Sequence, residues 1–391
     1  MRVGHLDPHG QFQNPQIPIN HGAVVIQDRN LVNDRAICPE IQERVTETET
    51  VRTNRLATNT LGDGYVEAIP DETLLKIRKE QCKGSHGKIC GQAIKVLVPE
   101  SEGADRIGRF GWKDQHASLL AFAGDAYLNE MGITNRLQKT EVTTICNPPV
   151  TTTIPNTDPT KITEPNSLPD PTDNSLEDID HFASFMRSLK APARDQTATA
   201  TPEVTHGAHL FAKIGCASCH VETIVTGKSP AAPEGPGLHP DTLANRAIHP
   251  YSDFLLHDVG TGDGIPIALV EHFGRERVEK RMRELQGSRA PEAKQHQRKT
   301  EDECSESYQT AVLEGEKHPD LLRDALCARN KLRTAPLWGL RVRSRLMHDG
   351  ASVKLGDAVR RHKGEAEEVT ERFFKLSPAD RRALLAFLQS L

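Results

Sequence analysis

The residues best suited to chemistry in this chain lie within ten positions, FAKIGCASCH, from Phe211 to His220. Cys216 and Cys219 are separated by two residues and His220 follows directly, which is the C-x-x-C-H attachment signature of a c-type haem. Each thiol can add across a vinyl group of the porphyrin, and the adjacent imidazole can then bind the iron. The sequence therefore predicts one covalent haem, attached through Cys216 and Cys219, with His220 as an axial iron ligand.

Two other interpretations of a C-x-x-C pair are a zinc half-site and a redox dithiol. A zinc site needs a second closely spaced pair of Cys or His ligands, and the other six cysteines do not form one. A redox motif of the thioredoxin type needs a surrounding βαβ pattern, which the sequence lacks. Residues 204–214 instead have the apolar spacing of a short amphipathic helix that runs into the motif, and this favours haem.

The composition bounds the fold and the partners. Only 36% of the residues are apolar and 4% aromatic, with 25 prolines and 28 glycines, which suits loops wrapped around a prosthetic group better than a large sheet. We therefore expect an all-α, loop-rich fold, and 391 residues are enough for two domains. A net charge of −5 spread over both signs excludes a nucleic-acid footprint, and the absence of any run of eighteen apolar residues excludes a membrane span.

Covalent haem attachment implies export from the cytoplasm, so a periplasmic location is expected, although the residues from Met1 onward do not begin a signal peptide. An oxidising compartment would let the six remaining cysteines pair. Local spacing favours Cys82 with Cys90 and Cys304 with Cys327, and free buried thiols are the alternative.

Amphipathic spacing and end signals also place the other helices and the loops between them. Helices are expected over residues 71–79, 117–131, 175–190 and 377–391. The Thr- and Pro-rich residues 143–174 are expected to be a long loop, and the highly charged residues 276–331 a surface insertion. The helices that end at Leu189 and Leu391 both close with F-x-x-S-L, which hints at two related domains.

Several short motifs resemble the bacterial di-haem oxidoreductase family, which is related to the di-haem cytochrome c peroxidases and to MauG. The resemblance runs from about residue 50 to the end, outside the charged insertion. The matching segments are GYVEAIP (64–70), GRFGWK (108–113), MGIT (131–134), GCASCH (215–220), PYSD (250–253), LLHD (255–258), TAPLWGL (334–340), MHDG (347–350) and HKGEA (362–366).

The resemblance implies two cytochrome c-like domains, residues 1–190 and 191–391. The family carries a first C-x-x-C-H in its N-terminal domain, where the reactive haem lies, and this chain has none there. We therefore expect one haem c in this chain, an incomplete first domain truncated at its N-terminus, and a second haem in the complete protein. The alternative is a gene that has lost peroxidatic function.

The family supplies the sixth iron ligand from a short helix after the His-Asp-Gly turn, and His362 occupies that place fourteen residues beyond His348. Met347, next to the turn, is the competing ligand, and an ordinary surface histidine at position 362 is the third possibility. Arg341, Arg343 and Arg345 lie two apart and are candidates for pairing with a haem propionate, with a solvated edge as the alternative.

Two residues resemble the machinery of the reactive haem. Trp112 resembles the tryptophan that relays electrons between the haems, although it would serve equally as a core residue. Glu130 resembles the acidic residue that assists cleavage of the peroxide O–O bond as an acid and base. The glutamine that accompanies it in the family is missing, because Leu120, Ala121 and Phe122 fill the matching stretch.

Three functions remain at this point. The first is a peroxidase-like oxidoreductase that takes electrons from a small redox protein or another donor and passes them to peroxide or another small-molecule oxidant. The second is a non-enzymatic mono-haem electron-transfer cytochrome. The third is an interaction module that uses the charged insertion, with the haem as structural filler. Whether the chain is an enzyme stays open between them.

Overall fold

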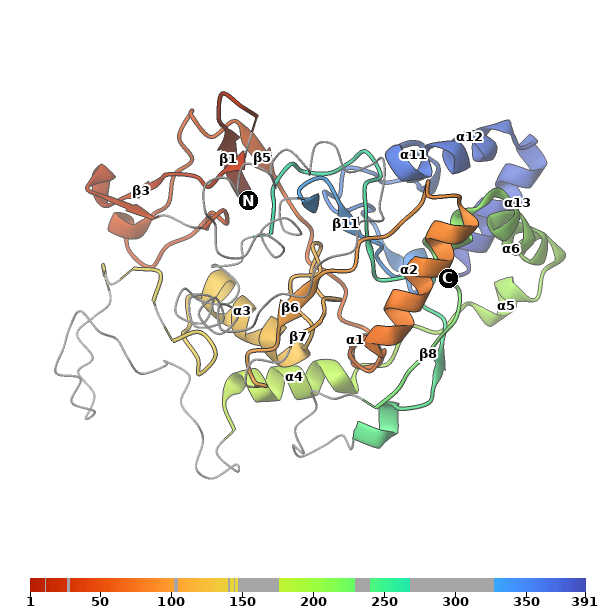
Figure 1. The fold of residues 1–391 in the computed structure, drawn as a ribbon, viewed down its shortest axis with the longest axis horizontal. Helices are drawn as coiled ribbons and strands as arrows, with labels where there is room; N and C mark the ends of the chain where they lie inside the picture. Colours follow the sequence, from red (N-terminus) through yellow and green to blue (C-terminus); the bar gives the residue numbers. More distant parts are fainter. Residues whose placement is uncertain are drawn as a thin grey trace, which may run out of the picture.

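The computed structural model describes residues 1–10, 12–26, 29–101, 105–139, 141–143, 145–146, 176–228, 240–267 and 327–391 (Figure 1). Most of the expected loop at 143–174 and of the charged insertion at 276–331 lies outside these residues. In the described part of the chain, no helix has the length and apolar character needed to cross a bilayer.

The N-terminal segment folds into small antiparallel sheets around a minor core. β1 (Arg2–Leu6) pairs with β2 (Phe12–Gln13) on one side and β5 (Val51–Thr53) on the other, and β3 (Ile17–Ile19) pairs with β4 (Val24–Ile26). Short 3-10 helices, η1 (Asn20–Gly22) and η2 (Pro39–Ile41), lie in the connections. Val3, Ile17 and Ile19 are almost fully buried in this core.

Short two-stranded sheets recur along the rest of the chain. β6 (Lys95–Leu97) pairs with β7 (Asp105–Ile107), β8 (Ile224–Val225) with β9 (Ala247–Ile248), and β10 (Leu256–His257) with β11 (Leu332–Arg333). The prediction of an all-α fold is therefore wrong, because the fold mixes helices with several small sheets. Strands of two to five residues are too short to show a clear alternation of apolar and polar residues, and their partners are often distant in sequence.

One helical core contains α1 (Asp63–Glu67), α2 (Asp71–Gly84), α3 (Leu119–Met131) and α4 (Asp178–Ser188). The Ser118 hydroxyl caps α3 by accepting from the Ala121 amide, and Gly132, with a φ of 71°, ends it. A reciprocal capping box between Glu177 and Asp180 starts α4. α3 and α4 pack together, as Figure 1 shows. The bounds of α2, α3 and α4 confirm the expected helices at 71–79, 117–131 and 175–190 within a few residues.

A second helical core is built on α6 (Pro202–Ile214) and α13 (Pro378–Gln389), which lie against each other in Figure 1. Gly207 permits this close approach, because a Cβ there would collide with the carbonyl of Ala383 and lie 2.8 Å from the Cβ of Phe387. The other helices among the described residues of this half are α5 (Gln196–Thr199), η3 (Cys216–Ser218), η4 (Pro240–Leu243), η5 (Leu340–Val342), α11 (Leu355–Arg360), η6 (Gly364–Ala366) and α12 (Glu367–Lys375).

The predicted domain boundary near residue 190 crosses a shared core. The first helical core takes in Ile224, Phe254, Leu255 and Trp338 from beyond that boundary. The division into residues 1–190 and 191–391 stays a prediction.

Two disulfides join described residues. The expected bond between Cys82 and Cys90 is confirmed, and a second bond joins Cys38 to Cys146. The predicted pair of Cys304 and Cys327 lies outside the described residues, because Cys304 is not among them.

Candidate haem site

A cavity of about 690 Å³ lies where the two halves of the chain meet. It is lined by residues of the C-x-x-C-H segment, of residues 56–61, of the long segment 332–348 and of α11 with the turn that follows it. This volume is in the range of small-molecule and cofactor sites. The lining is mainly apolar, with Phe211, Leu340 and Phe373 among its buried residues.

The end of α6 delivers the C-x-x-C-H motif to this cavity. Gly215, with a φ of 104°, ends the helix in the left-handed conformation that a side chain would oppose. The chain then turns through η3, so that Cys216, Cys219 and His220 all line the cavity. The two thiols are the free cysteines of the described residues, and burial raises the pKa of Cys216 to about 12. A redox dithiol would instead lower that pKa.

The His220 imidazole is held in one orientation by the backbone. Its Nδ1 lies 2.9 Å from the carbonyl oxygen of Tyr251, to which it donates, and this leaves Nε2 as the free nitrogen. Burial lowers the pKa of His220 to about 4, so the ring is neutral at pH 7. An imidazole whose second nitrogen donates to a carbonyl is the usual arrangement of a metal-binding histidine.

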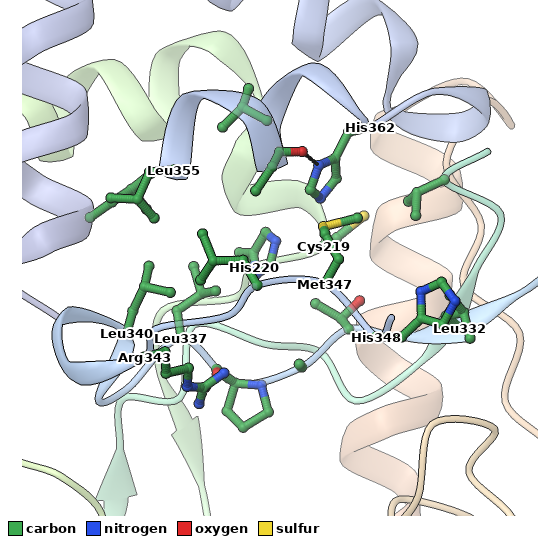
Figure 2. Close-up of a pocket in the computed structure, with 18 of the residues that line it drawn as sticks. Cys219, His220, Leu332, Leu337, Leu340, Arg343, Met347, His348, Leu355 and His362 are labelled. Atoms are coloured by element: carbon green, nitrogen blue, oxygen red, sulfur yellow. Dashed lines mark hydrogen bonds between the residues drawn. The ribbon is translucent and has the colours of Figure 1, made fainter. Parts of the chain in front are cut away.

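His362 shows the same arrangement on another wall of the cavity. It lies two residues beyond the end of α11, and its Nδ1 donates to the carbonyl of Ala358 at 2.8 Å, as Figure 2 shows. Burial also lowers the pKa of His362. Met347 lines the cavity too, with a φ of +67° that is unusual for a residue with a side chain. The structure thus brings both proposed sixth ligands to the cavity that holds His220.

The arginines of the 341–345 stretch separate into two groups. Arg343 and Arg345 line the cavity, whereas the guanidinium of Arg341 donates to the carbonyls of Ala193 and Leu391 outside it. With Arg333, the described lining contains three arginines and no carboxylate side chain. Such a lining fits a ligand that carries negative groups, as the propionates of a haem do.

Trp112 also lines this cavity, and its indole nitrogen donates to the carbonyl of Leu56 at 2.7 Å. Its ring centre lies 6.1 Å from that of the buried His348, in an edge-on arrangement. Asp349, the next residue of the turn, forms a two-pronged ion pair with Arg361 just after α11. Glu130 is different, because it is exposed at the end of α3 and is not part of the cavity lining.

A buried network beside the motif was missed by the sequence analysis. The Nε2 atom of His257 lies 2.9 Å from Asp253, and its Nδ1 lies 2.9 Å from Glu365 and 3.7 Å from the sulfur of Cys219. Gln81 of α2 donates to Asp253 and to the carbonyl of Ser218. Asp253, His257 and Glu365 lie in three of the segments that carry the family resemblance, PYSD, LLHD and HKGEA, but the sequence assigned none of these three residues a role.

Cys219, Asp253 and His257 also form a group of metal-ligand atoms within 4.8 Å of one another. However, both ring nitrogens of His257 already have carboxylate partners, with Nε2 2.9 Å from Asp253 and Nδ1 2.9 Å from Glu365. The free Nε2 atoms of His220 and His362 make the haem interpretation the better fit.

Comparison with known proteins shows the family of this chain. The family model described as "Di-haem oxidoreductase, putative peroxidase" matches residues 27–288 and 312–391, so the chain belongs to this family. No curated protein matches. Among solved structures, a hydrazine synthase from Kuenenia stuttgartiensis is matched at 19% identity and a TM-score of 0.27. That match covers 55% of each chain, so the chain spans about half the length of that protein.

Proposed function

We propose that this chain holds one c-type haem in the described cavity and serves as an electron-transfer centre of a periplasmic oxidoreductase. The observation that carries the proposal is the pairing of two unbonded thiols with two imidazoles of free Nε2 in one cavity. Cys216 and Cys219 attach the porphyrin, and His220 and His362 bind the iron.

A haem supplies one-electron redox chemistry at its iron. The protein residues fix how it is used. The carbonyls of Tyr251 and Ala358 hold the two imidazoles with Nε2 available, and Arg343 and Arg345 neutralise the propionates. If His220 and His362 both bind the iron, the haem would supply electron transfer at this site and would not bind peroxide.

Peroxide or another small oxidant would then react at a second haem, as the di-haem description of the family implies. In this proposal Trp112, at the edge of the cavity beside His348, relays electrons from the first haem, and Glu130 assists at the second. A small redox protein or another donor supplies the electrons. The alternative is a mono-haem carrier without peroxidase activity, in which Glu130, outside the lining of this cavity, has no role in chemistry.

The test is haem content. After expression with a haem c maturation system, a haem-stained band should persist on denaturing gels and disappear in the Cys216→Ala/Cys219→Ala variant. The Cys82→Ala/Cys90→Ala variant serves as the matched control and should retain the band. Covalent haem in the first variant would reject the site. Two haems per full-length protein support the peroxidase, and one supports the carrier.

A further inference from the structure

The cavity reaches the surface along one edge, where residues that line it are also exposed. Val342 is 77% exposed, and Ser344 and Arg345 are exposed as well. We call the three segments 56–62, 189–194 and 339–345 the cavity mouth. A haem in this cavity would be nearest to solvent there.

These segments form one continuous surface. The amide of Gly62 donates to the carbonyl of Leu189 at 3.2 Å, and Arg341 donates to the carbonyl of Ala193 at 2.6 Å. Gly339 lies against Pro192, because a Cβ at position 339 would be 3.0 Å from the Pro192 ring. The mouth is therefore a single rim assembled from three parts of the chain.

The rim has a strong charge bias. Its segments contain five basic residues and no aspartate or glutamate, although the whole chain has a net charge of −5. Three of them, Lys190, Arg341 and Arg345, are exposed. Of the other two, Arg194 lies over the rings of Tyr251 and Phe387, and Arg343 donates to two backbone carbonyls. Two propionates would offset part of this charge and still leave the rim positive.

Apolar side chains lie within this rim. Val342 is the most exposed of them, and Leu61 and Leu56 are 39% and 37% exposed. An apolar centre surrounded by charged, arginine-rich residues is the usual composition of a small protein interface. Opposite charge on the partner steers its approach and raises the association rate, while a small contact lets it leave quickly.

We propose that the cavity mouth is the docking site of a small acidic redox protein, which exchanges electrons with the haem across Val342. The partner is recognised by carboxylates around its own redox centre. This proposal rests on the proposed function, because it requires a haem behind the mouth.

The test uses reduced plant-type [2Fe–2S] ferredoxin, an acidic low-potential protein, as the probe. Its rate of reduction of the haem is measured by stopped flow between about 0.01 M and about 1 M salt, where the screening length falls from about 30 Å to about 3 Å. The wild-type rate should fall by about tenfold or more as salt rises.

Charge variants of exposed residues distinguish electrostatic attraction of the partner from the fit of its surface to the rim. Val342→Glu with Lys190→Glu should lower the low-salt rate by about tenfold, whereas Val342→Lys, which disturbs the apolar contact similarly, should not lower it. Arg44→Glu, exposed outside the cavity lining, is the remote control and should behave as wild type. Reduction by a neutral photoreduced deazaflavin should be equal in wild type and Arg44→Glu, and the ferredoxin rate of each Val342 variant is divided by its own deazaflavin rate.

Three results would overturn the proposal. If the ferredoxin rate did not change with salt or with charge reversal, while deazaflavin reduced the haem normally, the docking site alone would be rejected. Charge-sensitive binding to anionic lipid vesicles without an effect on ferredoxin would assign the rim to a membrane surface. Protein without covalent haem, or with haem that deazaflavin does not reduce, would reject the proposed function and the docking site with it.

Discussion

At the scale of single residues, the two cavity histidines are held by the same kind of hydrogen bond. A backbone carbonyl takes the Nδ1–H of His220 and of His362, so the tautomer and the ring plane of each are set by the main chain. Such contacts raise the basicity of a ligand and hold it in place before the metal centre forms. Two imidazole ligands give an iron of lower potential than a thioether ligand does.

His362→Ala should therefore open one axial position. The ferric haem of the wild type should be low-spin and lack the sulfur-to-iron charge-transfer band. The variant should become high-spin or bind added imidazole or cyanide, as seen in absorption and EPR spectra. Met347→Leu, a change of similar volume on the same cavity wall, should leave the spectrum nearly unchanged.

A methionine-ligated spectrum in the wild type would transfer the axial role to Met347. A high-spin wild type would contradict both assignments, because it would mean that this iron has an open position and is itself the reactive haem.

The sequence pointed to cavity residues whose side chains are distinctive. It did not point to residues that contribute only a main-chain atom. The spacing of Cys216, Cys219 and His220 is a signature, and His362 followed from its place after the His-Asp-Gly turn. Tyr251 contributes a carbonyl to His220, and any residue type has a carbonyl. No sequence pattern marks such a role.

At the scale of elements, helices were predictable and strands were not. Amphipathic spacing and end signals placed α2, α3, α4, α6 and α13 within a few residues. The sheet of β1 pairs Gly4 with Val51, and β10 pairs His257 with Leu332, so the partners that make these strands lie far away in sequence. Two-residue strands depend on that pairing more than on their own residues.

The crossing of α6 and α13 offers a stability test. Gly207→Ala should destabilise the protein by roughly 1–3 kcal/mol, because the added Cβ collides with the Ala383 carbonyl of α13. Gly356→Ala in α11 is the matched control, since no atom lies within 4 Å of its added Cβ. That change should stabilise by about 0.4–1 kcal/mol. Urea unfolding measures both, and equal effects would contradict the close packing.

At the scale of the whole molecule, a buried ion cluster ties distant segments together. Asp263 accepts from Arg55 at 2.6 Å and lies 3.2 Å from the ammonium of Lys113. The same ammonium donates to the carbonyls of Ala328, Arg329 and Lys331. Four parts of the chain are thereby joined beside the cavity, an arrangement that composition could not reveal.

The cluster predicts how stability depends on acid. Arg55 and Lys113 lower the pKa of Asp263 from 3.8 to about 2 against the opposing effect of burial. The unfolded chain therefore binds more protons between these values, and this stabilisation is present above about pH 4 and lost as pH falls toward 2. A shift of this size corresponds to about 2 kcal/mol.

Asp263→Asn should remove this acid dependence and, at pH 7, cost roughly 3 kcal/mol, because a buried site would lose the carboxylate that pairs with Arg55 and Lys113. Urea unfolding at several pH values checks both effects. Asp357→Asn, at an exposed position in α11, is the control and should leave the curve nearly as in wild type. If Asp263→Asn lost stability below about pH 4 to the same extent as wild type, other carboxylates would be responsible for that loss.

The coexistence of the two kinds of cysteine has a consequence for biogenesis. The Cys38–Cys146 bond spans 108 residues and must form by oxidation after translation has passed both positions. The same oxidant would convert Cys216 and Cys219 into an internal disulfide, which cannot add to a vinyl group. If the proposed haem is attached here, its ligation would compete with this oxidation. A cell that produces the protein would then need a reductant that keeps the C-x-x-C pair reduced until the haem is bound.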